Sequence, residues 1–362
     1  MRSNESVTIE LNSVSAGIER RRTVGRGLLV ATLLLFCVEM FLHTDAFLHR
    51  FRSVFAAGRA LDKVVHVEAH PPDLLILGNS RADNGFDPRT VQAQFDRSTV
   101  TRTFNMGLPG ADTRVLAGVV DRLERSGAFG KGGVRQVVLS LDESLVQPVD
   151  SLGQEVFFAN VPRMWADGQH RDALRAVFRL YGYSDNLRQL REPAVLERFI
   201  HAARRDVPPV GGAAAVHLGY RRGVGGLQDQ QSVQLQEAES VQPPSAVNVS
   251  HLWRMLDLLA SRGVQVAVVF PPLLNRNVLY LESDRPDAVP YSAIAAELQR
   301  RGIPVIVLDR EVPRTPAEFV NPGHLNDRGA QRYSVLLGRA LASIWHAGSG
   351  EEGPGSSGNR GP

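Results

Sequence analysis

One short segment, LLILGNS at residues 74–80, places the strongest constraint on how this chain can fold. Its four leading apolar residues do not alternate with polar ones, which predicts a strand buried on both faces, as in a parallel sheet. The polar residues that follow Ser80 predict the start of a helix. Ser80 would then lie at the carboxyl edge of the sheet, where open α/β folds bind their ligands. Two interpretations of Ser80 stay open at this point: a functional hydroxyl, or an ordinary helix N-cap.

Further strands and helices are expected to alternate along the chain. Apolar runs predict strands at 103–105, 134–141, 264–270 and 303–308, and helical periodicity predicts helices at 88–95, 113–125, 250–262, 291–301 and 328–345. Ser250 is the expected N-cap of its helix, and Gly263 is the expected stop. This alternation predicts an α/β domain over residues 73–347, with a parallel sheet covered by helices on both faces.

The alternation breaks down between about residue 150 and residue 247. Helices are expected at 171–180 and 194–205, whereas 208–226 and 228–244 are rich in Gly or Gln and predict loops. We interpret this block as an insertion in the same domain. Its arginines indicate either a solvated helix face, which the interleaved acids favour, or a surface that attracts an anionic glycan or lipid headgroups. They are Arg171, Arg175, Arg188, Arg191, Arg198, Arg204, Arg205, Arg221 and Arg222.

Residues 27–48 predict where the protein lies in the cell. The run GLLVATLLLFCVEMFL at 27–42 is slightly shorter than the ~20 apolar residues of a spanning helix, and Phe47 and Leu48 can extend it. Its leucines, valines and phenylalanines favour insertion by about 3 to 6 kcal/mol, whereas the off-centre Glu39 opposes it by about 3 kcal/mol or less. We therefore expect an uncleaved transmembrane anchor rather than a signal peptide.

Arginines flank the N-terminal side of this expected anchor: Arg20, Arg21, Arg22 and Arg26. By the positive-inside rule they predict a cytoplasmic tail at 1–26 and a periplasmic remainder, that is, a single-pass protein of the inner membrane. Between the anchor and the domain, residues 49–72 are expected to form a stem. Residues 1–19 and the Gly/Ser-rich tail at 348–362 are expected to be disordered.

The composition excludes some classes of function. The net charge of +3 over 362 residues gives no reason to expect a nucleic-acid partner, and the sequence has no zinc-ligand spacing or RNA-binding signature. The only cysteine, Cys37, lies in the expected anchor, so no internal disulfide is possible. We predict neither a metal site nor a cofactor.

Two later segments bear on the interpretation of Ser80. One is FNMGLPGADT at 104–113, and the other is NPGHLNDRGA at 321–330. Together with the segment around Ser80 they resemble, in this order, the Ser, Gly and Asp-x-x-His blocks of the SGNH (GDSL-type) hydrolase and acyltransferase family. The resemblance spans about Asp73 to Trp345. It implies a three-layer, flavodoxin-like α/β/α fold, which agrees with the alternation of strands and helices.

The resemblance implies that Ser80 is the nucleophile and His324 its base. A serine hydroxyl needs a base to take its proton, and imidazole can accept and return a proton near neutral pH. The sequence departs from the family at Asn321, where the family has the Asp that orients the histidine. Three explanations stay open: Asn321 orients a Ser–His dyad, another acid such as Asp142 or Glu318 takes that role, or the site is catalytically weak.

For the oxyanion, the resemblance implies the backbone N–H groups of Ser80 and Gly110, with Asn105 of the same block as a supporting residue. Gly110 is equally explained as a turn glycine after Pro109. The side-chain donor that many family members supply from a Gly-x-Asn-Asp block is missing. Its absence is typical of the anchored, envelope-modifying branch of the family, such as the alginate O-acetylation proteins and the lipoteichoic-acid D-alanylation protein.

These features predict a membrane-anchored periplasmic enzyme that adds or removes an acyl group, expected to be acetyl, on a cell-envelope polysaccharide. Ser80 would carry the acyl group, and a multispanning membrane acyltransferase would be a fitting partner. Asn321 and the missing donor motivate a second hypothesis, a non-catalytic envelope scaffold that binds glycan or a membrane partner. A third, a lipase or thioesterase for soluble substrates, is disfavoured by the anchor.

Overall fold

A computed structural model describes residues 25–51, 57–96, 100, 102–130, 132–148, 158, 160–204, 212–221, 242–308 and 314–347. Several sequence predictions lie outside these residues. They are the tails at 1–24 and 348–362 and the part of the predicted loops at 222–241.

The centre of the molecule is a five-stranded parallel sheet, as the sequence predicted. Its strands are β1 (Leu74–Gly78), β2 (Thr103–Gly107), β3 (Gln136–Ser140), β4 (Gln265–Phe270) and β5 (Val305–Val307). The spatial order β2-β1-β3-β4-β5 is the flavodoxin-like one, in which the connections reverse direction between β1 and β3. Ligands of such sheets bind at the carboxyl ends of these two strands.

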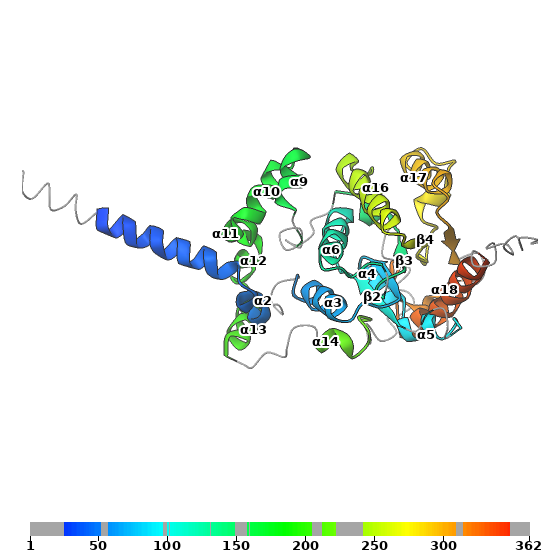
Figure 1. The fold of residues 1–362 in the computed structure, drawn as a ribbon, viewed down its shortest axis with the longest axis horizontal. Coiled ribbons are helices and arrows are strands. Elements are labelled where there is room, and N and C mark those ends of the chain that lie inside the picture. Colours follow the sequence, from blue (N-terminus) through cyan, green and yellow to red (C-terminus); the bar gives the residue numbers. More distant parts are fainter. Residues whose placement is uncertain are drawn as a thin grey trace, which may run out of the picture.

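Both faces of the sheet are covered by helices (Figure 1). Leu75 and Leu77 of β1 pack into one apolar cluster, whereas Leu74 and Ile76 pack into the other, because alternate side chains of a strand point to opposite faces. The first cluster includes α3 (Ala57–Ala69), α6 (Thr113–Arg125), α16 (Ala246–Ser261) and α17 (Val289–Arg300). The second includes α5 (Pro88–Gln92) and α18 (Asp327–Ala347).

Most predicted elements differ from the structure by a few residues at their ends, and three differ more. The expected N-cap Ser250 is wrong: α16 starts at Ala246 with Ser245 as its N-cap, because the helix continues back almost to Pro244. The helix expected at 171–180 is divided at Phe178 into α10 (His170–Val177) and α11 (Arg179–Gly182). The loop expected at 208–226 contains the short helix α14 (Gly212–Ala215).

The segment predicted as a stem contributes to the core. Its helix α3 packs onto the sheet through Ala60, Val64 and Val67, all of which are almost completely buried. On the N-terminal side of α3 lie α2 (Asp45–Phe51) and an apolar helix, Gly25–Leu42, that is long and apolar enough to cross a membrane. We call Gly25–Leu42 the apolar helix below.

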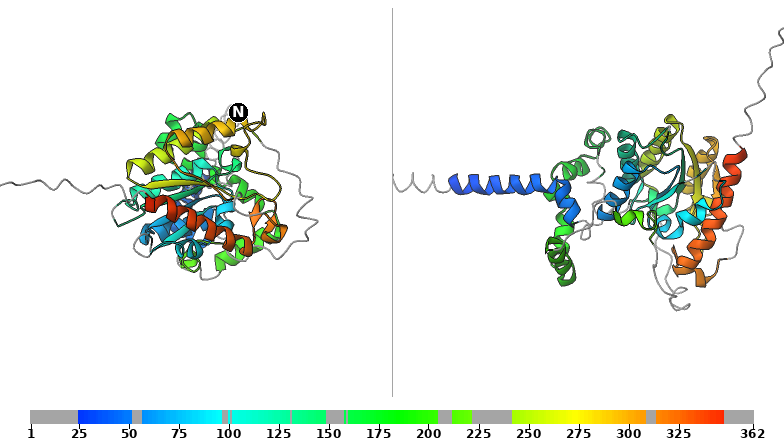
Figure 2. Two further views of the ribbon diagram at one scale, coloured as in Figure 1. Left: turned by 90° about the vertical axis from the view of Figure 1, so that its right-hand side faces the viewer. Right: turned by 60° about the horizontal axis from the view of Figure 1, so that its bottom comes forward.

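The inserted block forms a layer of short helices between the apolar helix and the sheet, which we call the insertion plate. It consists of α9 (Val161–Ala166), α10, α11, α12 (Ser184–Gln189) and α13 (Pro193–Arg204). Figures 1 and 2 show the plate standing across the end of the apolar helix. A third apolar cluster joins them, and its buried members are Leu42, Phe47, Phe51, Leu61, Tyr183 and Ala202.

The first prediction concerns Gly107, at the end of β2. A Cβ there would lie 2.2 Å from the backbone nitrogen of Asp83, in the helix that follows β1. Because backbone cannot move aside cheaply, we expect Gly107→Ala to lower the free energy of unfolding by about 1–3 kcal/mol or more. The matched control is Gly85→Ala in that helix, whose nearest atom is 3.7 Å away. Urea unfolding followed by circular dichroism measures both, and equal midpoints would contradict the prediction.

Candidate active site

Ser80 is the first residue of α4 (Ser80–Gly85), which follows β1 at the carboxyl edge of the sheet. The N-cap of α4 is Asn79, whose Oδ1 accepts a hydrogen bond of 2.9 Å from the backbone N–H of Arg81. The interpretation of Ser80 as the cap is therefore wrong, because its neighbour does that work. The Ser80 hydroxyl is left available for another partner.

That partner is His324. The Ser80 Oγ and His324 Nε2 atoms are 2.8 Å apart, although the two residues are separated by 244 positions in the sequence. His324 opens β7 (His324–Leu325), which pairs with β6 (Phe319–Asn321) in a small hairpin beside α4. Both side chains are half-buried, so the pair lies at the surface of the domain and not in its core.

Asn321 holds the other side of the imidazole. Its Oδ1 lies 3.0 Å from His324 Nδ1 and also accepts a 3.0 Å hydrogen bond from the backbone N–H of Gly323. A backbone N–H can only donate, so the atom that faces it is the amide oxygen, and Nδ1 must carry a proton to donate to the same oxygen. Nε2 then presents a lone pair to the Ser80 hydroxyl. This is the tautomer that a general base requires.

The two acids considered as replacements for Asn321 have other partners. The Asp142 carboxylate, which is buried after β3, accepts from Asn79 Nδ2 at 2.8 Å and lies 3.0 Å from Arg81 Nη1. The Glu318 carboxylate lies 2.6 Å from Arg332 Nη1. Of the three side chains, the structure brings Asn321 into contact with the imidazole.

Arg81 was not recognised from the sequence, yet it lies between the two halves of the site. Its guanidinium is nine-tenths buried, pairs with Asp142 behind Ser80, and packs against Gly323 in the turn that precedes His324. The same turn and the end of β3 are thus held by one side chain. Its Nη2 and Nε atoms are the ones nearest Gly323 and its Nη1 atom pairs with Asp142, so one guanidinium reaches both elements.

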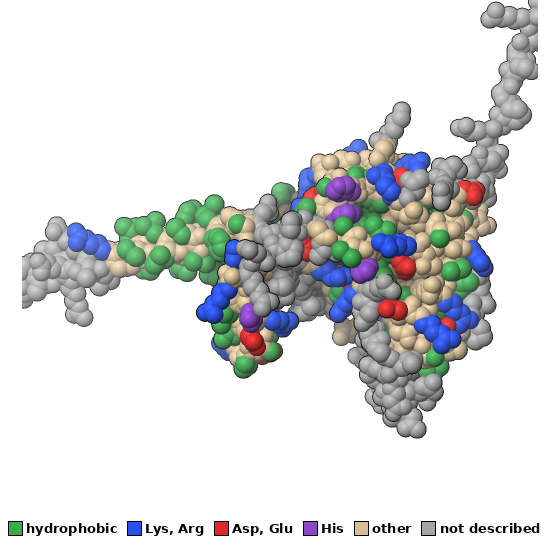
Figure 3. Space-filling view, turned by 90° about the horizontal axis from the view of Figure 1, so that it is seen from below, with side chains coloured by type: hydrophobic (Ala, Val, Ile, Leu, Met, Phe, Trp, Pro, Cys, Tyr) green, Lys and Arg blue, Asp and Glu red, His purple; other side chains and the backbone are tan. Residues whose placement is uncertain are grey.

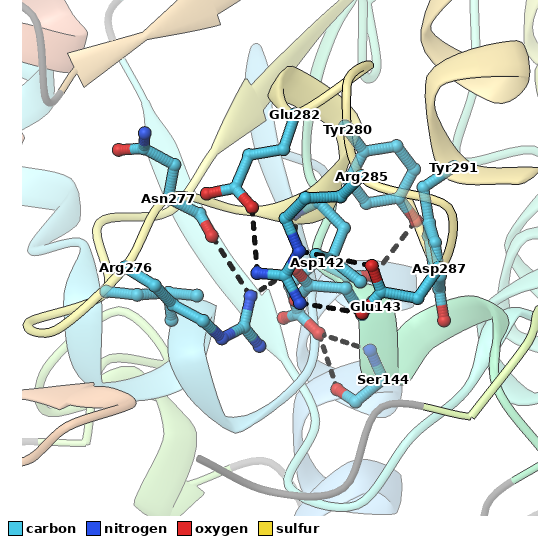
Figure 4. A network of polar contacts seen from close by, with 12 residues as sticks. Asp142, Glu143, Ser144, Arg276, Asn277, Tyr280, Glu282, Arg285, Asp287 and Tyr291 are labelled. Atoms are coloured by element: carbon cyan, nitrogen blue, oxygen red, sulfur yellow. Dashed lines mark hydrogen bonds and ion pairs between the residues drawn. The ribbon is translucent and has the colours of Figure 1, made fainter. Parts of the chain in front are cut away.

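The polar contacts continue outward from the end of β3 (Figure 4). Ser144 donates to Asp142, and Glu143 accepts from Arg276 at 2.7 Å. Tyr280 donates to the Asp142 carbonyl oxygen at 3.2 Å. Burial, with the Glu143 charge as a smaller cause, raises the pKa of Tyr280 well above its usual value, so this hydroxyl stays protonated. The segment after β4, which carries Arg276 and Tyr280, thus supports Asp142 and Glu143, and through Asp142 it supports Arg81.

The candidate residues of the Gly block have separate positions. Asn105 is buried and donates from Nδ2 to the carbonyl oxygens of Ala82 and Phe86, both at 2.7 Å, so it holds the backbone of α4. Gly110 lies in the turn after β2 with φ +74°, a conformation that favours glycine. The turn itself therefore accounts for glycine there, and its N–H lies at the same sheet edge as Ser80.

A second buried group missed from the sequence holds α4 from the other side. Lys63 of α3 donates to Asp83 Oδ1 at 2.7 Å and to the Gly107 carbonyl oxygen, and Arg59 also pairs with Asp83 at 2.9 Å. Burial lowers the pKa of Lys63 to about 8, against the opposing effect of the Asp83 charge. Lys63 lies on the same face of α3 as the buried Ala60. This spacing was the signal in the sequence that could have indicated a buried lysine.

No protein-family model matches the chain, and no curated protein matches it significantly. Within the described part of the chain, no three or more His, Cys, Asp and Glu side chains are grouped so that they could hold a metal ion. A serine, a correctly protonated imidazole and an orienting amide have the arrangement that a nucleophile, its general base and the support of that base require.

The second prediction tests the orienting role of Asn321. Asn321→Ala removes the acceptor of the Nδ1 proton, so we expect the reaction of Ser80 with a fluorophosphonate to slow by about 10-fold or more. Asn321→Asp keeps an oxygen in place and adds a charge that favours the imidazolium, so its rate should match or exceed that of the parent chain. Asn275→Ala, at an exposed position after β4, is the control. Equal rates in all three variants would contradict the role.

The third prediction concerns the buried ion pair of Arg81. Arg81→Met leaves the Asp142 carboxylate buried without its cation, which typically destabilises a protein by about 3–5 kcal/mol. The control is Arg285→Met, because Arg285 pairs with Glu282 and Asp287 in an exposed position. We expect no measurable shift for the control. Urea unfolding compares the two variants, and a negligible effect of Arg81→Met would show that this pair does not stabilise the site.

Proposed function

We propose that the chain is a serine-dependent esterase or acyltransferase of the SGNH type. The observation that carries the proposal is the 2.8 Å contact between Ser80 Oγ and His324 Nε2, with His324 Nδ1 held by Asn321. Two features of the fold support it further: Ser80 follows β1 at the switch point of a flavodoxin-like sheet, and His324 comes just before the last helix, α18.

The proposed reaction has two steps. His324 Nε2 takes the Ser80 proton as Oγ attacks the carbonyl carbon of an acyl ester, and the negative charge of the tetrahedral intermediate falls on the former carbonyl oxygen. Collapse breaks the ester bond, and His324 gives its proton to the departing alcohol. The acyl-Ser80 ester is then attacked by a sugar hydroxyl or by water, with His324 again as base, and Ser80 regains its proton.

The backbone N–H groups of Ser80 and Gly110 are the proposed donors to the oxyanion. Ser80 is the first residue of α4, and the N–H of a first helical residue has no acceptor within its own helix. Gly110 is at the neighbouring strand end and exposes its backbone because it lacks a side chain. An amide at residue 321 cannot stabilise the imidazolium as a carboxylate would, so we expect slow turnover.

The substrate follows from the proposed location. The apolar helix is long enough to span a membrane, and the arginines that precede it favour a cytoplasmic N-terminus. The catalytic domain would then lie outside the cytoplasmic membrane, close to envelope polysaccharides. We propose O-acetyl transfer or removal on such a polysaccharide, with a multispanning acyltransferase as the partner that supplies the acyl group.

A specific observation favours one other function, a glycan-binding scaffold without catalysis. Asn321 stands where a carboxylate would support the imidazolium, and the sequence has no Gly-x-Asn-Asp block to supply a third oxyanion donor. Loss of one such donor can lower a rate by about 10²–10³-fold. The scaffold requires that Ser80→Ala and His324→Ala leave the cellular phenotype intact.

The fourth prediction tests the nucleophile. A fluorophosphonate probe should label the parent chain, Ser80→Ala should abolish labelling, and His324→Ala should slow it by about 10²–10⁴-fold, the usual contribution of a general base. Ser126→Ala is the matched control, because the Ser126 hydroxyl is exposed and caps its own helix. Mass spectrometry of the labelled peptide identifies the modified residue. Labelling that persists in Ser80→Ala would overturn the proposal.

A further inference from the structure

The insertion plate carries apolar side chains that no part of the described structure covers. Leu174 and Val177 on α10, Phe178 at its division from α11, and Tyr181 on α11 are all exposed. Phe178 alone is 53% exposed, which is unusual for so large an apolar side chain. On α13, Leu196 and Ile200 are exposed in the same way. Apolar surface gathered like this marks an interaction site.

We call the exposed apolar segment from Leu174 to Tyr181 the stripe. The end of the apolar helix is hydrogen-bonded to the backbone of this segment. Glu39 accepts hydrogen bonds from the backbone N–H groups of Arg179 and Leu180, and His43 Nε2 donates to the Val177 carbonyl oxygen at 3.1 Å. Glu39 lies three residues before the end of the helix at Leu42. At a rise of 1.5 Å per residue, this is about 5 Å from the end of the span. If the apolar helix crosses a bilayer, the stripe lies at the bilayer's interfacial depth.

Charged side chains of both signs join the plate to the body of the domain, and one of them is Arg163, which pairs with Asp121 of α6 at 2.9 Å. Towards the sheet, Asp167 pairs with Arg254 at 2.7 Å and Asp172 with Arg114 at 3.1 Å, so acids of the plate are bound to the body of the domain. The arginines outnumber the remaining acids. The exposed arginines are Arg171, Arg188, Arg191, Arg198 and Arg204. Figure 3 shows basic side chains on the plate beside the apolar helix.

We propose that the outer face of the insertion plate rests in the headgroup region of an anionic phospholipid bilayer. The stripe from Leu174 to Tyr181, with Leu196 and Ile200, enters the boundary between headgroups and acyl chains, and the arginines contact lipid phosphates. This inference rests on the membrane anchoring included in the proposed function, but not on the catalytic chemistry. A bilayer is the partner that fits this face, because the end of the apolar helix and the stripe lie at the same level.

The fifth prediction uses the single cysteine of the chain. Cys37→Ala gives a cysteine-free background, into which Phe178→Cys or Leu196→Cys introduces one site for an environment-sensitive nitrobenzoxadiazole label. The full chain is reconstituted in vesicles of phosphatidylethanolamine and phosphatidylglycerol, with and without bromines on the acyl chains. We expect labels at 178 and 196 to be quenched at least twofold by the brominated lipid. Val289→Cys on α17 is the matched control, since Val289 is equally exposed but lies far from the plate, and should not be quenched.

A label on the native Cys37 separates the two proposals. Quenching at Cys37 without quenching at 178 and 196 overturns the inference while the anchor stands. Quenching at none of these positions overturns the anchoring and the inference with it. Replacing phosphatidylglycerol by phosphatidylcholine should weaken quenching at 178 and 196, and equal quenching in both lipids overturns the role of the arginines. Quenching at 178 and 196 that is equalled at 289 also overturns the inference, because the label then reports non-specific contact.

Discussion

The candidate site depends on buried polar contacts that cross the switch point between β1 and β3. Asn79 caps α4 with one end of its amide and donates to Asp142 with the other, so the start of α4 and the end of β3 are joined by one side chain. Arg81 adds an ion pair to the same carboxylate and packs on the turn before His324. In a region of low dielectric such groups tolerate few alternative arrangements, because an unpaired one is costly. The position of the Ser80 hydroxyl relative to the imidazole follows from this network.

In serine hydrolases a carboxylate both holds the histidine in the productive tautomer and stabilises the imidazolium. The amide of Asn321 can do the first but not the second. Because its oxygen also accepts from Gly323, the amide cannot turn its NH₂ group toward the imidazole without losing that bond. The productive tautomer is thereby maintained. The negative charge that would stabilise the imidazolium is still missing. The hydrogen bonds of Asn321 therefore replace the orienting effect of a carboxylate but not its electrostatic effect. For the proposed reaction, the missing charge predicts slow turnover with either acceptor.

Much of this arrangement could be predicted from the sequence, and the exceptions have physical causes. Helix α6 coincides with the predicted 113–125 because its apolar face and its cap are both local signals. The start of α16 was missed because its first turn, from Ala246, precedes the apolar residues that define the pattern. Arg81 gave no local signal of its role, and Lys63 gave only its place on the face of α3 that carries Ala60, since the partners of both lie in other elements. Tertiary contact alone shows why these cations are buried.

Glu39 joins the apolar helix to the insertion plate. In the sequence it argues against membrane insertion, because an acid in an apolar helix is costly. In the structure its carboxylate accepts two backbone N–H groups at the start of α11, so the charge is solvated by the insertion plate at the end of the helix. At the proposed membrane location, these two hydrogen bonds would lower the cost of placing Glu39 at this level. Because the plate is also ion-paired to α6 and α16, its position on the bilayer would set the height at which Ser80 meets its substrate.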